Sequence, residues 1–379
     1  MKRSVATAVM VIFCVFVCCN VYGVNDELRR AAEAGDVKAQ IELGEYYARN
    51  RKFDDAEIWY RKAAEQNSAQ GRYKLAKLVI RRKKGADRAE AIKLIIEAAE
   101  QNYAPAMLEL ASCYANGNGV PKDRQMAQEL RLKAAETGNA YAQWCYANSL
   151  VSKKDHQGAF QWYKKAAEQN DHSAQRDLAY CYKFGRGVKQ NYAEALKWFE
   201  KAAESKMKSA FCEIGNLYAE GKGVPQDVGK ALEYYRKAGK FYAPAGLRIA
   251  DIYRNGSPGV AKDINKAFKL YERIVTRSAQ NEAKWIAHIR LGDLYANGEG
   301  VEKDYRKALK YYRKAADRLY AEAEYKIGQL YEKGQGVPRD LNEAAKWYYK
   351  ASKRYVCRKL PHPKAKAAYK RVMKLKKSR

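Results

Sequence analysis

The sequence predicts an all-α solenoid of stacked helix-turn-helix repeats, and three observations lead to this prediction. Pairs of alanine recur along the chain at steps of mostly 35 or 36 residues. Each step contains two apolar stripes with helical spacing, and many steps carry a Gly-x-Gly motif between the stripes. A fixed period in this range is typical of supersecondary structures that bury their apolar faces against their neighbours.

The N-terminus has the layout of a secretory signal, which we place at residues 1–23. Lys2 and Arg3 form a short positive region, and an apolar run follows over residues 5–19. This run is shorter than the roughly 20 residues that cross a bilayer, although an uncleaved N-terminal anchor is the alternative. We therefore expect an exported protein, located in the periplasm, in the cell envelope or outside the cell.

The alanine pairs mark about nine repeats within residues 24–355. The pairs are Ala31-Ala32, Ala63-Ala64, Ala98-Ala99, Ala134-Ala135, Ala166-Ala167, Ala202-Ala203 and Ala315-Ala316, with Ala238-Gly239 and Ala351-Ser352 as variants. The repeats start near residues 39, 69, 106, 142, 174, 210, 245, 287 and 323. A longer step after Ile274 indicates an insertion between Thr276 and Ala287.

The repeat at residues 287–316 shows the pattern most clearly. Its first stripe consists of Ala287, Leu291, Leu294 and Tyr295, and its second stripe consists of Ala308, Tyr311, Tyr312 and Ala315. Both have the spacing of one helix face. Gly298 and Gly300 supply the turn, and Asp304 is a natural N-cap for the second helix. The repeats near 39, 69 and 142 lack Gly-x-Gly, so we expect tighter hairpins there.

The combined pattern, Ala-x-x-x-Leu-Gly-x-x-Tyr-x-x-Gly-x-Gly-Val followed by Asp, Ala and an aromatic pair before Lys-Ala-Ala, resembles the Sel1-like repeat, a relative of the tetratricopeptide repeat. The resemblance extends over roughly residues 31–351. It implies a right-handed superhelix of antiparallel helical hairpins. It also implies an adaptor that holds protein partners in a concave groove, often in bacterial envelopes, without naming the partner.

Aromatic residues follow the repeat. In pairs such as Trp162-Tyr163, we expect one ring in the core and its neighbour at a helix seam. One first-helix position holds a tyrosine in most repeats, and we expect these residues to form a core ladder: Tyr47, Tyr114, Tyr182, Tyr218, Tyr253, Tyr295 and Tyr331. Variable first-helix positions are the candidates for a partner-binding groove: Arg176, Phe211, Arg248, Arg290 and Tyr325.

The sequence contains no catalytic, cofactor-binding or metal-binding motif that would predict an enzyme. The four histidines lack metal-ligand spacing. Ser205 and Lys208 form a bare Ser-x-x-Lys, but the other elements of a β-lactam-binding site do not accompany it. Some cysteine-rich relatives are linked to β-lactams, so a cell-wall or β-lactam-interacting enzyme is the alternative function. A self-associating envelope protein is a third hypothesis.

The cysteines give a weaker indication of structure. Cys113, Cys145, Cys181 and Cys212 fall on first helices of different repeats, and Cys357 lies near the C-terminus. Their number is odd, and none forms a CxxC pair. We expect the four first-helix cysteines to fill core space as small apolar residues rather than to form disulfides.

Positive charge is concentrated at the C-terminus. The net charge is +30, and residues 350–379 contain thirteen Lys or Arg and no acidic residue. We expect residues 356–379 to form a basic capping helix or tail that aids electrostatic docking to an anionic membrane surface or an acidic glycan. The candidate residues are Lys364, Lys366, Lys370, Arg371, Lys374, Lys376 and Lys377. Export and the lack of a nucleic-acid-binding module argue against nucleic acid as the partner.

Overall fold

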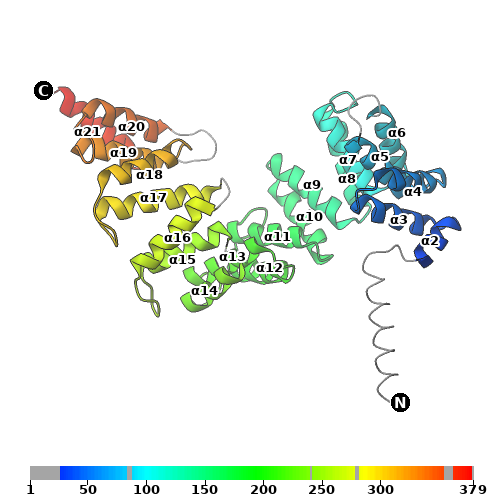
Figure 1. Cartoon of the computed structure of the whole chain (residues 1–379), viewed down its shortest axis with the longest axis horizontal. Coiled ribbons are helices and arrows are strands. Elements are labelled where there is room, and N and C mark those ends of the chain that lie inside the picture. Colours follow the sequence, from blue (N-terminus) through cyan, green and yellow to red (C-terminus); the bar gives the residue numbers. More distant parts are fainter. Residues whose placement is uncertain (1–25, 83–87, 240, 278–280, 354–361, 378–379) are drawn as a thin grey trace, which may run out of the picture. The chain divides into compact units, whose positions relative to one another are not determined.

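The structure of the protein, a computed structural model, describes residues 26–82, 88–239, 241–277, 281–353 and 362–377. These residues form twenty helices and no strand (Figure 1), so the predicted all-α class is confirmed. The chain divides into two compact units, residues 1–189 and 190–379. The predicted signal at residues 1–23 and Cys357 lie outside the described residues.

The first unit consists of ten described helices that pack in sequence order. They are α2 (Asp26–Glu33), α3 (Val37–Arg49), α4 (Phe53–Glu65), α5 (Ala69–Arg82), α6 (Arg88–Glu100), α7 (Ala104–Asn116), α8 (Arg124–Glu136), α9 (Ala140–Ser152), α10 (His156–Glu168) and α11 (His172–Phe184). From α3 onward, each odd-numbered helix is the first helix of a repeat and each even-numbered helix is its second helix. Second helices pack against the first helix of the following repeat, as α4 does on α5 and α8 on α9.

The second unit begins with the second helix of the fifth repeat and ends with an additional helix. Its helices are α12 (Tyr192–Glu204), α13 (Lys208–Glu220), α14 (Val228–Lys237), α15 (Ala243–Asn255), α16 (Ile264–Arg277), α17 (Glu282–Asn297), α18 (Tyr305–Ala316), α19 (Ala321–Lys333), α20 (Leu341–Lys353) and α21 (Ala365–Lys377). Helix α21 packs on α20 and buries Ala368 and Val372. It therefore covers the apolar side of the last hairpin.

The turn chemistry of the sequence is present in the structure. Gly298 ends α17 in the left-handed conformation (φ +73°), and Asp304 begins α18 by accepting a hydrogen bond from the Lys307 backbone N–H at 2.9 Å. In repeats without Gly-x-Gly, three residues connect α3 to α4, with Arg51 at φ +59°, and three connect α9 to α10, with Lys154 at φ +66°. The prediction of tighter hairpins is confirmed for these two repeats.

The largest core side chains come from one position of the second helix, three residues before the first alanine of the pair. We call it the ladder position. Its residues are Tyr60, Ile95, Arg131, Tyr163, Phe199, Tyr235, Tyr271, Tyr312 and Tyr348. All of them are buried except Arg131, which is half-buried. The predicted arrangement of aromatic pairs is confirmed, because Tyr163 is buried and its neighbour Trp162 is half-buried.

Small residues on the first helix make room for the ladder. A Cβ atom on Gly215 would lie 2.6 Å from Cε1 of Tyr235, and one on Gly328 would lie 2.7 Å from Cε1 of Tyr348. Such distances are shorter than carbon–carbon contact allows, so glycine at this position permits the two helices to approach. Glycine therefore brings the paired helices together at these two sites.

The predicted core ladder of first-helix tyrosines is wrong. Tyr47, Tyr114, Tyr182, Tyr218, Tyr253, Tyr295 and Tyr331 are all half-buried. They lie at the end of the first helix and pack against the edge of the core; Tyr218 stacks on Tyr234 and Tyr295 on Tyr311, with ring centroids 5.7 Å apart in both pairs. The stacked partner covers one side of the Tyr218 and Tyr295 rings, and all seven tyrosines stay partly exposed at the edge of the core.

The cysteines of the first helices are free thiols. Cys113, Cys181 and Cys212 are buried, which confirms their predicted role as small core side chains, whereas Cys145 is half-buried and lines a surface recess. Among the residues described, no helix combines the length and the apolar character that a membrane span requires.

Candidate partner-binding surface on the first helices

The first helices form one continuous face in each unit. First helices of successive repeats contact each other directly, as α3 does with α5, α7 with α9, and α15 with α17. Between described second helices of successive repeats, no comparably extensive contact occurs. First helices therefore lie closer together than second helices, which places their exposed side on the inner side of the stack within a unit. We call this side the first-helix face.

Two positions of the first helix define the chemistry of this face. When the motif alanine is counted as position 1, positions 4 and 7 lie one helical turn apart and point to the same side. Several ladder tyrosines donate a hydrogen bond from their hydroxyl group to the residue at position 7 of the first helix in the same repeat. The Tyr163 hydroxyl donates to Asn148 Oδ1 at 3.0 Å, that of Tyr235 donates to Asn216 Oδ1 at 2.9 Å, and that of Tyr312 donates to Asp293 Oδ1 at 2.8 Å.

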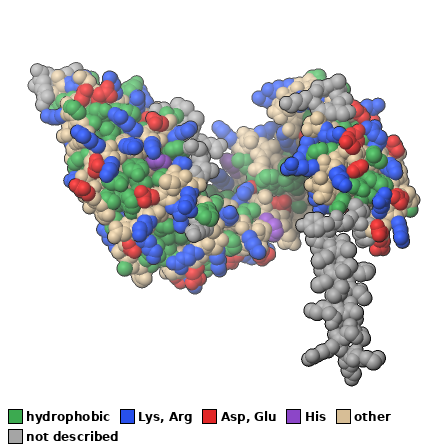
Figure 2. All heavy atoms as spheres, in the orientation of Figure 1, with side chains coloured by type: hydrophobic (Ala, Val, Ile, Leu, Met, Phe, Trp, Pro, Cys, Tyr) green, Lys and Arg blue, Asp and Glu red, His purple; other side chains and the backbone are tan. Residues whose placement is uncertain are grey.

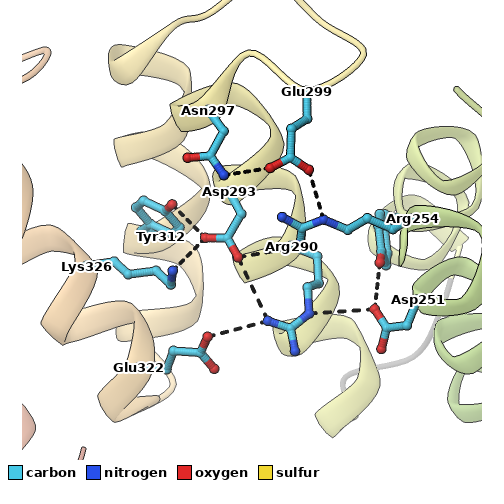
Figure 3. A network of polar contacts seen from close by, with 10 residues as sticks. Asp251, Arg254, Arg290, Asp293, Asn297, Glu299, Tyr312, Glu322 and Lys326 are labelled. Atoms are coloured by element: carbon cyan, nitrogen blue, oxygen red, sulfur yellow. Dashed lines mark hydrogen bonds and ion pairs between the residues drawn. The ribbon is translucent and has the colours of Figure 1, made fainter. Parts of the chain in front are cut away.

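In the second unit, positions 4 and 7 carry a network of opposite charges (Figure 3). Asp293 accepts the Tyr312 hydroxyl bond and pairs with Lys326 at 2.8 Å. Arg254 approaches Asp293 at 3.6 Å and Glu299 at 3.3 Å. We call this group the Arg290 network; its members are Asp251, Arg254, Arg290, Asp293, Asn297, Glu299, Tyr312, Glu322 and Lys326.

Arg290 lies at the centre of this network. Its guanidinium is 3.6 Å from Asp251, 3.8 Å from Asp293 and 3.4 Å from Glu322. These acidic residues come from α15, α17 and α19, so one arginine bridges three successive first helices. The network thus uses its charges to join repeats to one another.

Ionisation of the network follows from these contacts. Burial alone would raise the pKa of Glu299, but hydrogen bonds from Asn297 and Arg254 lower it below its ordinary value. Burial raises the pKa of the Tyr312 phenol far above its ordinary value, and the neighbouring Asp293 raises it further. The phenol therefore stays neutral and donates a hydrogen bond to the carboxylate.

In the first unit, the same positions hold charge pairs in the first two repeat junctions. Lys74 pairs with Glu45 at 2.5 Å, which joins α5 to α3. Lys77 pairs with Glu109 at 2.9 Å, which joins α5 to α7. Further along, the Trp144 indole N–H donates to Asp177 at 2.8 Å and joins α9 to α11.

Between α8 and α9, beside Ala115 of α7, the first-helix face opens into a recess of about 560 Å³. We call it the Arg131 recess; it is lined by Ala115, Arg124, Ala127, Gln128, Arg131, Cys145, Asn148, Ser149, Ser152 and Lys153. Three of these residues are basic and none is acidic. Within the part of the chain that the structure describes, no carboxylate lies within ion-pair distance of Arg124, Arg131 or Lys153.

The five predicted groove residues do not form one site. Arg176 lies on α11 of the first unit, where its guanidinium binds the neighbouring Asp177 at 2.8 Å and 3.0 Å. Phe211 is half-buried against a core cluster that includes Cys212 and Tyr235. Arg248 is exposed at position 4 of α15.

The other two predicted groove residues are engaged within the second unit. Arg290 is the centre of the network described above. The ring of Tyr325 stacks on His362, with ring centroids 3.9 Å apart, and also contacts Tyr348. His362 precedes α21, so the segment that leads into the last helix covers one side of Tyr325.

The predicted basic residues lie on α21 or just before it. Lys364, Lys366, Lys370, Lys374 and Lys376 are exposed, and we call them the basic helix face. The Lys377 side chain lies outside the described residues. Arg371 instead binds Glu332 of α19 at 2.7 Å and 2.9 Å. Its guanidinium holds the last helix on the repeat stack and is not free for a surface.

Outside the last helix, positive charge is dispersed. On the view drawn in Figure 2, Lys and Arg side chains are spread over the surface, and Asp and Glu side chains lie among them. Ser205 ends α12, where its hydroxyl donates to the Ala202 carbonyl at 2.8 Å and acts as a helix-end contact. No group of three or more potential metal ligands occurs among the described residues.

Sequence reasoning missed Arg131 and the acidic half of the Arg290 network. The signal for Arg131 was available, because this arginine stands three residues before the alanine pair at Ala134, where other repeats carry Tyr, Phe or Ile. Asp251 and Asp293 share position 7, and their role depends on basic residues one repeat away. A reading of single helices does not bring these residues together.

Comparison with known proteins agrees with this architecture. The family model described as Sel1 repeat matches nine segments: residues 37–68, 73–103, 104–139, 138–171, 172–206, 212–240, 243–275, 285–318 and 321–355. A sequence comparison with curated proteins gave no significant match.

Two solved structures resemble the chain over most of its length. One is a protective antigen present in uropathogenic Escherichia coli strains that displays an SLR fold; it is 26% identical, with a TM-score of 0.54, over 93% of this chain and 91% of that one. The other is a Sel1 repeat protein from Oxalobacter formigenes; it is 24% identical, with a TM-score of 0.61, over 92% of this chain and 90% of that one.

Proposed function

The chain belongs to the Sel1 repeat family, and we propose that it is an exported adaptor that holds a segment of a partner protein on its first-helix face. Sel1 repeat scaffolds generally mediate protein interactions and are generally not enzymes. The proposal specifies the surface, the exported location and a role for the basic C-terminus.

One observation carries the choice of surface. Within this chain, the residues that build each repeat recur, whereas position 4 of the first helix changes from repeat to repeat. From the first repeat to the ninth, it holds Glu42, Lys74, Glu109, Cys145, Asp177, Glu213, Arg248, Arg290 and Lys326. Packing alone would favour the same residue type at equivalent sites, so this variation supports a surface that distinguishes one partner segment from others.

Photo-crosslinking from two sides of one repeat tests the surface. We would place a photoreactive amino acid at Arg248, exposed on α15, and at Lys269, exposed on α16 of the same repeat. After irradiation in an extract of the source cell's envelope, we expect a defined protein to be crosslinked from position 248 and not from position 269. Equal crosslinking from both positions, or none from either, would contradict the proposal.

Two observations support export. Residues 1–23 have the layout of a secretory signal. The similar protein from uropathogenic Escherichia coli is described as a protective antigen, a description that is compatible with export. Cell fractionation and the mass of the mature protein test this part. We expect the protein in the envelope or the medium with a new N-terminus near Val24; an intact cytoplasmic chain would refute export.

The basic helix face supports a second contact, with anionic lipid headgroups. Its five exposed lysines project from a helix whose apolar side is buried against the stack, so the charges remain in solvent. Each lysine near an anionic surface contributes on the order of 1 kcal/mol of attraction. Because this attraction is screened by salt, we expect docking at low ionic strength and release at high ionic strength.

Vesicle sedimentation tests this contact. With phosphatidylglycerol-containing vesicles, we expect replacement of Lys366, Lys370, Lys374 and Lys376 by Gln to reduce binding on the order of a hundredfold or more. A matched control replaces four exposed lysines elsewhere: Lys93, Lys197, Lys269 and Lys310. An equal loss in the control would assign binding to total charge. Release of the protein by an acidic glycan at lower charge concentration than by lipid would favour glycan docking instead.

A further inference from the structure

We propose that the Arg131 recess binds the carboxylate of a glutamate or aspartate side chain in the partner's segment. This inference rests on the proposed function, because it adds a chemical requirement to the first-helix face. It specifies an acidic residue in the partner and the guanidinium that receives it.

The position of Arg131 is the first argument. Every other repeat buries an aromatic or aliphatic side chain at the ladder position, and all eight of those residues are at most 4% exposed. In the third repeat, an arginine replaces that side chain and is half-buried. A guanidinium cannot be buried fully without a counter-charge, because removing a charge from water costs several kcal/mol. The position is therefore left open, and the recess is the result.

The hydrogen bonds of the recess are the second argument. Its neutral polar groups are already satisfied inside the protein. Gln128 donates to Ser149 Oγ at 3.0 Å, and Ser149 donates to the Tyr146 carbonyl at 2.6 Å. Asn148 donates to the Trp144 carbonyl at 3.0 Å.

The same amide completes its bonding through its oxygen, because Asn148 Oδ1 accepts the Tyr163 hydroxyl at 3.0 Å. The charged side chains that make no ion pair with a described residue are the three cations of the recess. Arg131 lies in the floor of the recess, and the exposed Arg124 and Lys153 lie at its rim. A ligand that binds here must therefore bring acceptors and negative charge.

The geometry of the floor favours a carboxylate. A guanidinium presents two parallel N–H groups that match the two oxygens of a carboxylate. The recess lies between α8 and α9, and two of its lining residues, Cys145 and Asn148, hold positions 4 and 7 on the first-helix face, where the partner's segment is proposed to lie. An acidic side chain that projects from that segment can enter the recess while its backbone stays on the face.

Another junction of the same unit provides an internal comparison. Between α3 and α5, the first-helix face has a smaller recess of about 420 Å³ that also contains basic residues. There, the ladder residue is still a buried tyrosine, Tyr60, and Lys74 is paired with Glu45. The Arg131 recess lacks both features. The need for an external acid is thus specific to the junction of α8 and α9.

Cys145 supplies a built-in reporter for occupancy. It is half-buried in the wall of the recess, whereas Cys113, Cys181 and Cys212 are buried and report any loss of folding. We would measure the rate of alkylation at each cysteine by peptide mapping, using the chain from Val24 to its C-terminus. The probes are acetyl-Ala-Ala-Glu-Ala-Ala-amide, the same peptide with Gln in place of Glu, glucuronate and inorganic phosphate.

We expect the Glu peptide to slow alkylation of Cys145 at concentrations at least about tenfold lower than the Gln peptide. Arg131→Gln should raise the protecting concentration by about tenfold to a hundredfold, the loss expected when a charge-assisted hydrogen bond is removed. Lys133→Gln, an exposed change on the same helix, should leave it unchanged. Because Arg131 lies near Cys145, protection is expressed relative to the ligand-free rate of each variant.

Each outcome decides the inference. Equal protection by the Glu and Gln peptides, or unchanged protection in Arg131→Gln, would overturn it. Stronger protection by glucuronate or phosphate than by the Glu peptide would assign the recess to another anion and would also overturn it. Partner crosslinking from position 248 that persists in Arg131→Gln with unchanged affinity would leave the adaptor function intact and refute the acid requirement. Peptide protection without any crosslinked partner would support the recess and contradict the adaptor.

Discussion

The Arg131 recess and the Arg290 network both lie at junctions between successive repeats, yet they differ in how positive charge is paired. In the network, Arg254, Arg290 and Lys326 all face carboxylates supplied by the same unit. In the recess, Arg124, Arg131 and Lys153 face none among the described residues. The basic side chains of the network are therefore paired with carboxylates of their own unit, whereas those of the recess are not.

This difference shows how a repeat protein can separate stability from recognition. A repeat junction must bury apolar surface to hold the stack together. The ladder residues and the small residues opposite them provide most of this buried surface. Charges on the first-helix face can then contribute either to stability or to partner recognition. When both signs are present they join neighbouring repeats, and when only one sign is present they are available to a partner.

The largest expected effect comes from opening the network. Asp293→Ala removes the carboxylate that faces Arg254, Arg290 and Lys326 and the acceptor of the Tyr312 hydroxyl. Asp293 is only 8% exposed, so its basic partners would be left in a poorly solvated site. Removing one partner of such a group costs about 3–5 kcal/mol. Denaturant unfolding, with hydrogen exchange to locate the loss to α15–α19, measures it.

The matched change in the recess is Arg131→Ala. It removes a cation that has no carboxylate partner, so we expect a change in the free energy of unfolding within about 0.5 kcal/mol. If Asp293→Ala and Arg131→Ala destabilise the protein equally, the contrast between a closed and an open junction is wrong.

The fold was largely predictable because one sequence pattern recurs, with variations, in nine repeats. The alanine pairs and the turn glycines recur at a fixed step, so each prediction for one repeat is checked by the others. The sequence predicts Asp304 as an N-cap on this basis, and the structure confirms it. Such features depend on contacts within one hairpin, which a single stretch of sequence contains.

The surface was less predictable because its properties depend on contacts between repeats. Whether Arg290 is a free groove residue or a bridge is decided by Asp251 in the preceding repeat and Glu322 in the following one. Tyr325 was expected to face a groove, but it lies against His362, 37 positions further along the chain. The first-helix tyrosines were misassigned for a related reason, since periodicity shows that a position recurs but not how deeply it is covered.

A second prediction concerns the link between ladder and face. Tyr312→Phe removes a hydrogen bond to a charged acceptor, and we expect a loss of about 1.5–3 kcal/mol in the free energy of unfolding. Tyr163→Phe removes the equivalent bond to the neutral Asn148, so the loss should be smaller, about 0.5–1.5 kcal/mol. Parallel denaturant titrations compare the two. A larger loss for Tyr163→Phe would contradict the view that the network concentrates electrostatic stability in the second unit.

A third prediction concerns a substitution that fills the recess. Arg131→Tyr restores the residue that six of the other eight repeats have at the ladder position. The new ring would fill the space between α8 and α9 with apolar surface, and we expect stabilisation of about 0.5–2 kcal/mol, as is usual when a cavity is filled. The unfolding midpoint in urea measures this change. Destabilisation would show that the surrounding side chains are shaped for a guanidinium in the folded protein itself.

The smallest expected effect is a dependence on pH that the network has and the recess lacks. The pKa of Glu299 is lowered in the folded protein, so its contribution to stability is fully present above the ordinary pKa of a glutamate and is lost as the pH falls through the lower, folded value. Between about pH 5 and pH 3, hydrogen exchange in α15 and α17 should therefore accelerate more than exchange in α7 and α9. Other carboxylates titrate in this range, so the informative quantity is the difference between the unmodified protein and Glu299→Gln. That difference should shrink with falling pH, because the unmodified protein loses the charge that the variant never has, and a constant difference would show that Glu299 does not couple Arg254 to the fold through its charge.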